Sequence, residues 1–288
     1  MKITHPLRTV FRPWLILMAA ASFTCAFTAP NWSEMTRRTA ENLLNAGARD
    51  FFAGTLRVEK AQLDQTLRLK IDGIRGEIAT PEKPVMLALG TLATREPLWR
   101  LLLLKPVTFE FSGLKPSGSS SDGLSGTLIY TPGWHWALEA QVAVHNLNLA
   151  EIAWVNPDNL AGSSGQMAGE IRLSQNAAGE SDFSTALLIA EPGGKLQARF
   201  FDSVTPYLPK KKKKTALEKL ASTHDLVGYS QASLEATLKN ADTVKAVFRI
   251  MVPEYNLNLN LKMTVKVDEK NAFMKLFQLL GLLQAKAS

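Results

Sequence analysis

Cysteine is almost absent from this chain, because Cys25 is the only one among its 288 residues. No disulfide can form within the chain, and a metal site built from several cysteines is excluded. If the chain lies outside the cytoplasm, its body must therefore be held together by packing, which a body of this length allows.

The signatures of common catalytic sites are also missing. The sequence has no Gly-x-Ser-x-Gly motif, no phosphate-binding glycine loop and no Gly-x-Gly-x-x-Gly after a predicted strand. The histidines at positions 5, 135, 145 and 224 are scattered and lack the spacing of metal ligands. We therefore expect a protein that is not an enzyme and that uses no metal and no cofactor.

Charged side chains are absent from residues 13–33, while Lys2, Arg8 and Arg12 precede this segment. The stretch from Trp14 to Trp32 is long enough, as a helix, to cross the roughly 30 Å hydrocarbon core of a bilayer. The basic flank predicts a single-pass anchor in an inner membrane, with a cytoplasmic N-terminus and a periplasmic body. The residues expected to contact lipid are Trp14, Leu15, Ile16, Leu17, Phe23, Phe27 and Trp32.

A cleaved signal peptide is the alternative for this segment. Phe27, Thr28 and Ala29 make a poor cleavage site, and Pro30 follows directly. Both interpretations place the rest of the chain outside the cytoplasm.

The net charge of +7 is concentrated in the N-terminal flank and in the lysine run at residues 210–214. Basic runs often bind nucleic acid or acidic membranes. Outside the cytoplasm we expect no nucleic acid, which leaves a solvated loop or a contact with anionic lipid headgroups.

Apolar and polar residues alternate over most of the remaining chain, which is typical of antiparallel strands with one buried face. The stretches that show this pattern are residues 66–72, 107–111, 134–144, 171–173, 183–189, 244–252 and 257–267. Gly73, Gly76 and residues 191–194 are expected at turns, and the Ser- and Gly-rich residues 116–126 in a flexible loop.

Helical patterns are fewer. A helix is predicted over about residues 34–52, ending before Gly54. A short apolar turn or helix is expected at residues 95–105, a helical insertion around residues 200–222, and an amphipathic helix at residues 272–284.

This layout resembles the AsmA-like proteins of bacterial envelopes. Leu56–Ala61 and Leu67–Gly76 look like the opening strands of that family. Glu96–Val107 is similar to a segment that precedes a strand in its members, and the stretch from Gly193 to Pro209 resembles a Gly-Gly strand followed by a Pro-Tyr-x-Pro stop. The chain is much shorter than the large members that span two membranes.

The resemblance implies a mainly β fold: a long curved antiparallel sheet, or half-pipe, with an N-terminal transmembrane helix and a few closing helices. The expected organisation is a cytoplasmic flank and anchor (1–33), a leading helix (34–54), a β-rich AsmA-like domain (55–270) and a C-terminal amphipathic helix (271–288). The implied function is to bind or guide acyl chains of phospholipid or another lipid in an apolar groove during outer-membrane biogenesis. Other envelope proteins are possible partners.

The candidate groove residues are the apolar members of the most regular strands and one Trp pair: Leu257, Leu259, Leu261, Met263, Val265, Val267, Phe248, Ile250, Trp134 and Trp136. Periodicity shows which residues share a face and not what covers that face, so ordinary core packing is the alternative. A structural subunit of a type II secretion system, similar to GspN, is the alternative function.

Overall fold

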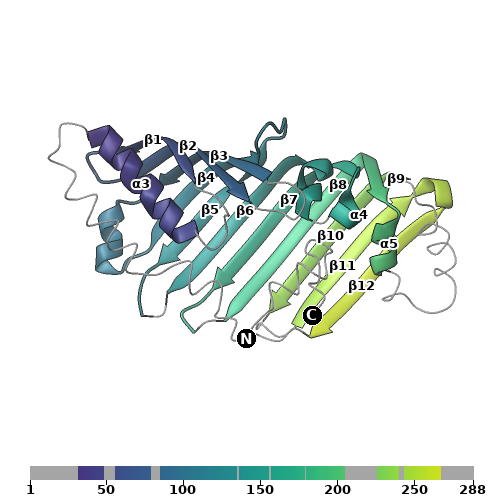
Figure 1. Cartoon of the computed structure of the whole chain (residues 1–288). Coiled ribbons are helices and arrows are strands. Elements are labelled where there is room, and N and C mark those ends of the chain that lie inside the picture. Colours follow the sequence, from purple (N-terminus) through teal and green to yellow (C-terminus); the bar gives the residue numbers. More distant parts are fainter. Residues whose placement is uncertain are drawn as a thin grey trace, which may run out of the picture. The chain divides into compact units, whose positions relative to one another are not determined.

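A computed structural model describes residues 32–48, 56–78, 85–134, 136–155, 157–178, 180–204, 226–239 and 243–266. Over these residues the protein is mainly β, and its strands form one antiparallel sheet that is not closed. The strand order is β1-β2-β3-β4-β5-β6-β7-β8-β10-β11-β12, and β9 pairs with β8 (Figure 1). The mainly β antiparallel class predicted from the alternating pattern is thus confirmed.

The chain divides into two compact units. Unit 1 comprises Met1–Val142 and Ser174–Gly179, and unit 2 comprises Ala143–Leu173 and Glu180–Ser288. The elements that begin in unit 1 are α3 (Trp32–Ala48), β1 (Arg57–Leu63), β2 (Leu69–Ile78), β3 (Val85–Thr94), the 3₁₀ helix η2 (Leu98–Leu103), β4 (Val107–Pro116), β5 (Gly123–Thr131) and β6 (Ala137–Asn148).

Among the described residues, three short helices, one 3₁₀ turn and six strands begin in unit 2. They are η3 (Leu149–Val155), α4 (Pro157–Leu160), β7 (Ser164–Gln175), β8 (Ser181–Gln197), α5 (Arg199–Val204), β9 (Leu226–Tyr229), β10 (Gln231–Lys239), β11 (Thr243–Val252), the 3₁₀ turn η5 (Pro253–Tyr255) and β12 (Leu257–Lys266).

The most regular alternation in the sequence forms the hairpin of β11 and β12. Ile250 lies opposite Leu259, and Phe248 opposite Leu261, whereas Arg249 lies opposite Asn260. Directly opposed residues share a face of the sheet, so this hairpin has one apolar face and one polar face, as predicted.

Unit 1 keeps its apolar residues on one face although the strict alternation breaks. Ile71 and Ile74 are three positions apart, yet both are buried in the same cluster. Gly73 lies between them with φ +67°. A residue in this left-handed conformation changes which face the following side chains take, while β2 keeps its register with β1 and β3. Gly113, with φ +72°, lies at a register shift in β4.

These glycines correct one expectation. Gly73 and Gly76 lie inside β2 and not at a turn after a strand. The predicted turn at residues 191–194 is likewise wrong, because β8 continues through the cis Glu191–Pro192 peptide to Gln197.

Two other boundaries differ from prediction. The connection between β4 and β5 is limited to residues 117–122, so most of the expected loop at residues 116–126 is strand or tight turn. Trp134 and Trp136 precede β6, so the strand expected from residue 134 begins instead at Ala137. Gly133 and Pro132 explain this difference, because both residues favour turns.

Several predictions fall outside the described residues. These are the anchor residues before Trp32, the lysine run at 210–214, and the amphipathic helix at 272–284. The predicted helix at 34–52 corresponds to α3, which is described from Trp32 to Ala48. Among the described helices, none combines the length and apolarity needed to cross a membrane.

Candidate functional site

The candidate groove residues of unit 2 lie in a packed cluster. Leu257, Leu259 and Leu261 on β12 are buried, as is Ile250 on β11. The buried residues that share this cluster with them are Leu149, Leu160, Ile189, Leu196, Ala198, Phe201, Val227, Tyr229 and Val252. Phe248 packs against it, with its ring centroid 5.4 Å from that of Phe200.

The contributing elements explain this burial. Residues of η3, α4, α5 and β9 all belong to the same cluster as the β11–β12 hairpin, so helices cover this part of the sheet. The backbone of Met263 and Val265 belongs to β12, and Val267 lies outside the described residues. That lipid contacts these positions stays a prediction.

Unit 1 presents its apolar face differently. Across β2, β3 and β4, Ile71 lies opposite Leu92, and Leu92 opposite Phe111. Phe109 lies opposite Leu128 one row away. Leu92, Phe109, Phe111 and Leu128 are only partly buried. We call these four residues the apolar face of unit 1.

Two helices border this face. Ala40 of α3 and Leu98 and Leu101 of η2 belong to the hydrophobic cluster against which Leu92, Phe109 and Leu128 pack. Trp136 packs against the same cluster, whereas Trp134 is 99% exposed. The structure therefore separates the two tryptophans that the sequence pattern placed together.

An exposed apolar group projects from η2. Leu98 and Leu101 are buried, but Trp99, Leu102, Leu103 and Leu104 are between 41% and 57% exposed. A 3₁₀ helix has three residues per turn, so positions 98 and 101 share its inner side and positions 99 and 102 its outer side. We call Trp99, Leu102, Leu103 and Leu104 the apolar tip.

The backbone fixes the end of this tip. Leu104 adopts φ 54° and ψ 31°, in the left-handed region. The Leu104 N–H donates to the carbonyl of Leu101 at 3.1 Å, and the Lys105 N–H to that of Arg100 at 2.9 Å. A leucine in this conformation is held at a cost of about 1 kcal/mol, and the surrounding hydrogen bonds maintain it.

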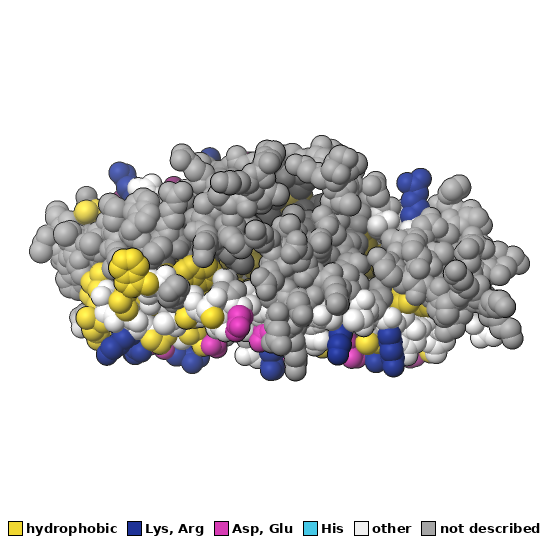
Figure 2. Space-filling view, turned by 90° about the horizontal axis from the view of Figure 1, so that it is seen from below, with side chains coloured by type: hydrophobic (Ala, Val, Ile, Leu, Met, Phe, Trp, Pro, Cys, Tyr) yellow, Lys and Arg dark blue, Asp and Glu magenta, His cyan; other side chains and the backbone are white. Residues whose placement is uncertain are grey.

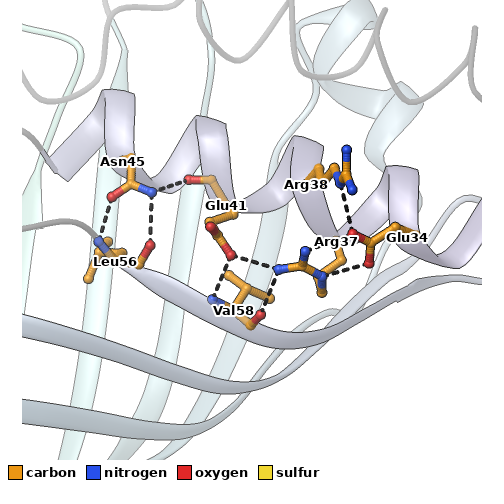
Figure 3. Close-up of polar contacts among 7 residues, drawn as sticks. All are labelled: Glu34, Arg37, Arg38, Glu41, Asn45, Leu56 and Val58. Carbon is orange, nitrogen blue, oxygen red and sulfur yellow. Dashed lines mark hydrogen bonds and ion pairs between the residues drawn. The ribbon is translucent and has the colours of Figure 1, made fainter.

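Polar side chains of α3 bind the backbone of β1, the first strand of the sheet, and of Leu56 directly before it (Figure 3). The Asn45 amide donates to the Leu56 carbonyl at 2.9 Å and accepts from the Leu56 N–H. Glu41 accepts from the Val58 N–H at 3.1 Å, and Arg37 donates to the Val58 carbonyl at 3.2 Å. We call these contacts the α3 clasp.

The clasp side chains are themselves paired. Arg37 forms ion pairs with Glu34 at 2.8 Å and with Glu41 at 2.9 Å. The hydrogen bonds from Arg37 and Arg38 lower the pKa of Glu34 to about 2. Glu34 therefore stays charged over the whole neutral and mildly acidic range.

A cleft of about 600 Å³ lies beside the clasp, lined by residues of α3, β1 and β2 that include Arg37, Arg57 and Arg75. Glu59 pairs with Arg75 at 2.6 Å, and Glu34 and Glu41 pair with Arg37. Carboxylates of the protein thus neutralise the guanidinium groups of Arg37 and Arg75.

No group of three or more His, Cys, Asp or Glu residues able to hold a metal occurs in the part of the chain that the structure describes. The chain matches no protein-family model, no curated protein and no solved structure. Its own geometry is therefore the basis for a functional proposal.

Sequence reasoning missed the apolar tip as a surface. The run from Leu101 to Leu104 was visible, with Trp99 before it and Lys105 after it. A run of apolar residues does not show which of them a turn will expose, and this information comes only from the 3₁₀ geometry.

Proposed function

We propose that this protein is a membrane-anchored envelope protein that binds lipid acyl chains along the apolar face of unit 1, with its body on the periplasmic side. The observation that carries the proposal is the partial exposure of Leu92, Phe109, Phe111 and Leu128 on one face of the sheet. By contrast, Leu257, Leu259 and Leu261 of β12 in unit 2 are buried.

The polar face supports the same proposal. Glu110 pairs with Arg95, and the hydroxyl groups of Thr91 and Ser112 are 2.7 Å apart. Ser112 neighbours Phe111 on β4, so one strand presents polar groups to one side and apolar groups to the other. This amphipathic arrangement suits a ligand that is itself divided into an apolar chain and a polar head.

The proposed mechanism is passive. Each methylene group removed from water contributes roughly 0.8 kcal/mol, whether it enters a bilayer or an apolar protein surface. Transfer between the two then has a small net free energy, and direction must come from another component. In this proposal the sheet curves into a half-pipe, the segment at residues 13–33 is the anchor, and the helices close the ends.

A photo-crosslinking amino acid at position 111 tests the proposal in the full-length protein expressed in bacterial membranes. Capture of phospholipid at position 111, and not at the matched position 112 on the opposite face, is the expected result. Absence of lipid adducts at both positions contradicts it. Phe111 is preferable to Leu261, because Leu261 is 3% exposed and a bulky probe there disturbs the core.

A structural subunit of a secretion apparatus is the second candidate. The observation that favours it is the burial of Ile250, Leu257, Leu259 and Leu261 on the β11–β12 hairpin of unit 2, which is ordinary core packing. A subunit of this kind is expected to purify in detergent without bound phospholipid, so lipid extraction followed by mass spectrometry separates the two functions.

A further inference from the structure

We propose that the apolar tip, together with Trp134, inserts into the interfacial layer of an anionic bilayer, the same bilayer that holds the predicted anchor. This contact rests on the proposed membrane anchor, but it is separate from acyl-chain binding on the apolar face. Figure 2 shows hydrophobic side chains gathered on one part of the surface, with basic and acidic side chains beside them.

The composition of this surface favours a membrane. Trp99 and Trp134 are 42% and 99% exposed, and Leu103 and Leu104 are more than half exposed. Soluble surfaces rarely gather so many large apolar side chains without a partner. Tryptophan prefers the membrane–water interface, and leucine prefers the acyl region just below it.

Topology places Trp134 at the same end as η2. β4 begins at Val107, directly after the tip, and Val107 lies opposite Tyr130 on β5. β5 runs toward this end and finishes at Thr131, so the turn that carries Trp134 follows at the same edge of unit 1.

The start of α3 lies at this end as well. Asn45 contacts Leu56, whereas Arg37 contacts Val58, so α3 runs opposite to β1. Its first residue, Trp32, is therefore directed toward the β1–β2 turn. In that turn the Leu67 carbonyl accepts a hydrogen bond from the Leu98 N–H of η2 at 2.9 Å.

This position identifies the occupant of the surface. The predicted anchor at residues 13–33 leads directly into α3, so the membrane that holds it faces the end of unit 1 that carries the tip. A partner protein would have to fit between this membrane and the apolar tip.

The charge of this end is complementary to acidic lipid headgroups. Arg68, Arg95, Arg100 and Lys105 give four positive charges. Asp64, Glu96 and Glu110, the last of which pairs with Arg95, give three negative charges, so the net charge is +1. The residues at 132–136 add no carboxylate. Basic side chains beside apolar ones are typical of surfaces that bind anionic bilayers.

The test uses the full-length protein in nanodiscs containing phosphatidylglycerol. Cys25 is replaced by Ser, and an environment-sensitive fluorophore is attached through Leu103→Cys. The matched control is Ser117→Cys, an exposed residue at the opposite end of β4. Brominated lipid is expected to quench the label at position 103 severalfold more than the label at position 117. Lys105→Glu should reduce this quenching in phosphatidylglycerol but not in phosphatidylcholine.

Two results overturn the proposal. In the first, brominated lipid quenches the labels at positions 103 and 117 equally weakly, and aqueous iodide reaches the label at 103 fully. This result shows that the tip stays in water. Protection of that label from both quenchers shows that protein covers it. Thermal unfolding of each variant checks that the fold is intact. Lipid crosslinking at position 111 is measured separately, so failure of the proposed function and failure of this inference are distinguishable.

Discussion

The side chain of Asn45 pairs with the backbone of Leu56 in the way that a neighbouring strand would. Its amide nitrogen donates to the Leu56 carbonyl, and its amide oxygen accepts from the Leu56 N–H. An edge strand otherwise presents such groups to other chains. The α3 clasp thus protects the start of β1 with side chains.

Asn45→Ala is expected to lower the free energy of unfolding by about 1–2 kcal/mol, because two backbone groups lose their partner. Chemical denaturation measures this change. Asn42→Ala is the matched control, since Asn42 lies on the same helix and is exposed. Equal stability of the two variants would show that water replaces the Asn45 amide without loss.

Gly193→Ala is expected to destabilise unit 2 strongly, by more than about 2 kcal/mol. Gly193 has φ +76°, and a Cβ there overlaps the backbone carbonyl oxygen of Tyr229. Gly118 has φ +84° but open space around it, so Gly118→Ala should cost only about 1 kcal/mol from the backbone conformation. Similar unfolding midpoints for both variants would contradict the close approach of β8 and β9.

Stability should fall as the pH rises from about 10 to about 12. Burial raises the pKa of Tyr229 to about 12, from an ordinary value of 10. In this range the unfolded state loses the phenol proton while the folded state retains it, so ionisation favours unfolding. Burial also raises the pKa of Tyr130, which adds a loss of the same sign.

Tyr229→Phe isolates the contribution of this residue. The Tyr229 hydroxyl donates to the Ser164 carbonyl at 2.8 Å, so the variant should lose about 1 kcal/mol at neutral pH. Its stability should then decline less steeply in alkali than that of the wild type. If the stability of the variant declines with rising pH as steeply as that of the wild type, the titrating group is not Tyr229.

The orientation of η2 predicts opposite effects for two neighbouring leucines. Leu101 is 3% exposed and Leu103 is 57% exposed. Leu101→Ala is expected to cost about 2–5 kcal/mol because it leaves a cavity. Leu103→Ala should leave the unfolding midpoint within error. If Leu103→Ala is the more damaging change, the tip is packed against protein.

The sequence pattern predicted the strands where side chains alternate without interruption, as in β11 and β12. It was wrong where backbone conformation decides. Gly73 resembles a turn residue, but its positive φ lets Ile71 and Ile74 share one face within β2. The run at residues 191–194 contains Pro and two Gly residues, yet pairing of Gly194 with Tyr229 on β9 keeps it in the sheet.

The candidate site was only partly accessible to sequence reasoning. Alternation placed Leu261 and Phe248 correctly on an apolar face, but not the residues of α5 and η3 that cover this face. Such cover comes from segments distant in sequence, which periodicity does not describe. Trp134 followed the alternating pattern by chance, because its turn ends before β6 begins.

The α3 clasp also has a mechanical consequence. Arg37, Glu41 and Asn45 are spaced one helical turn apart along an element that runs opposite to β1. A pull along the helix axis at Trp32 stretches all three attachments together in shear, rather than breaking them one after another. A force that acts on the chain before α3 would therefore be transmitted to β1 along its length, and α3 would act as a stiff coupling rather than a loose tether.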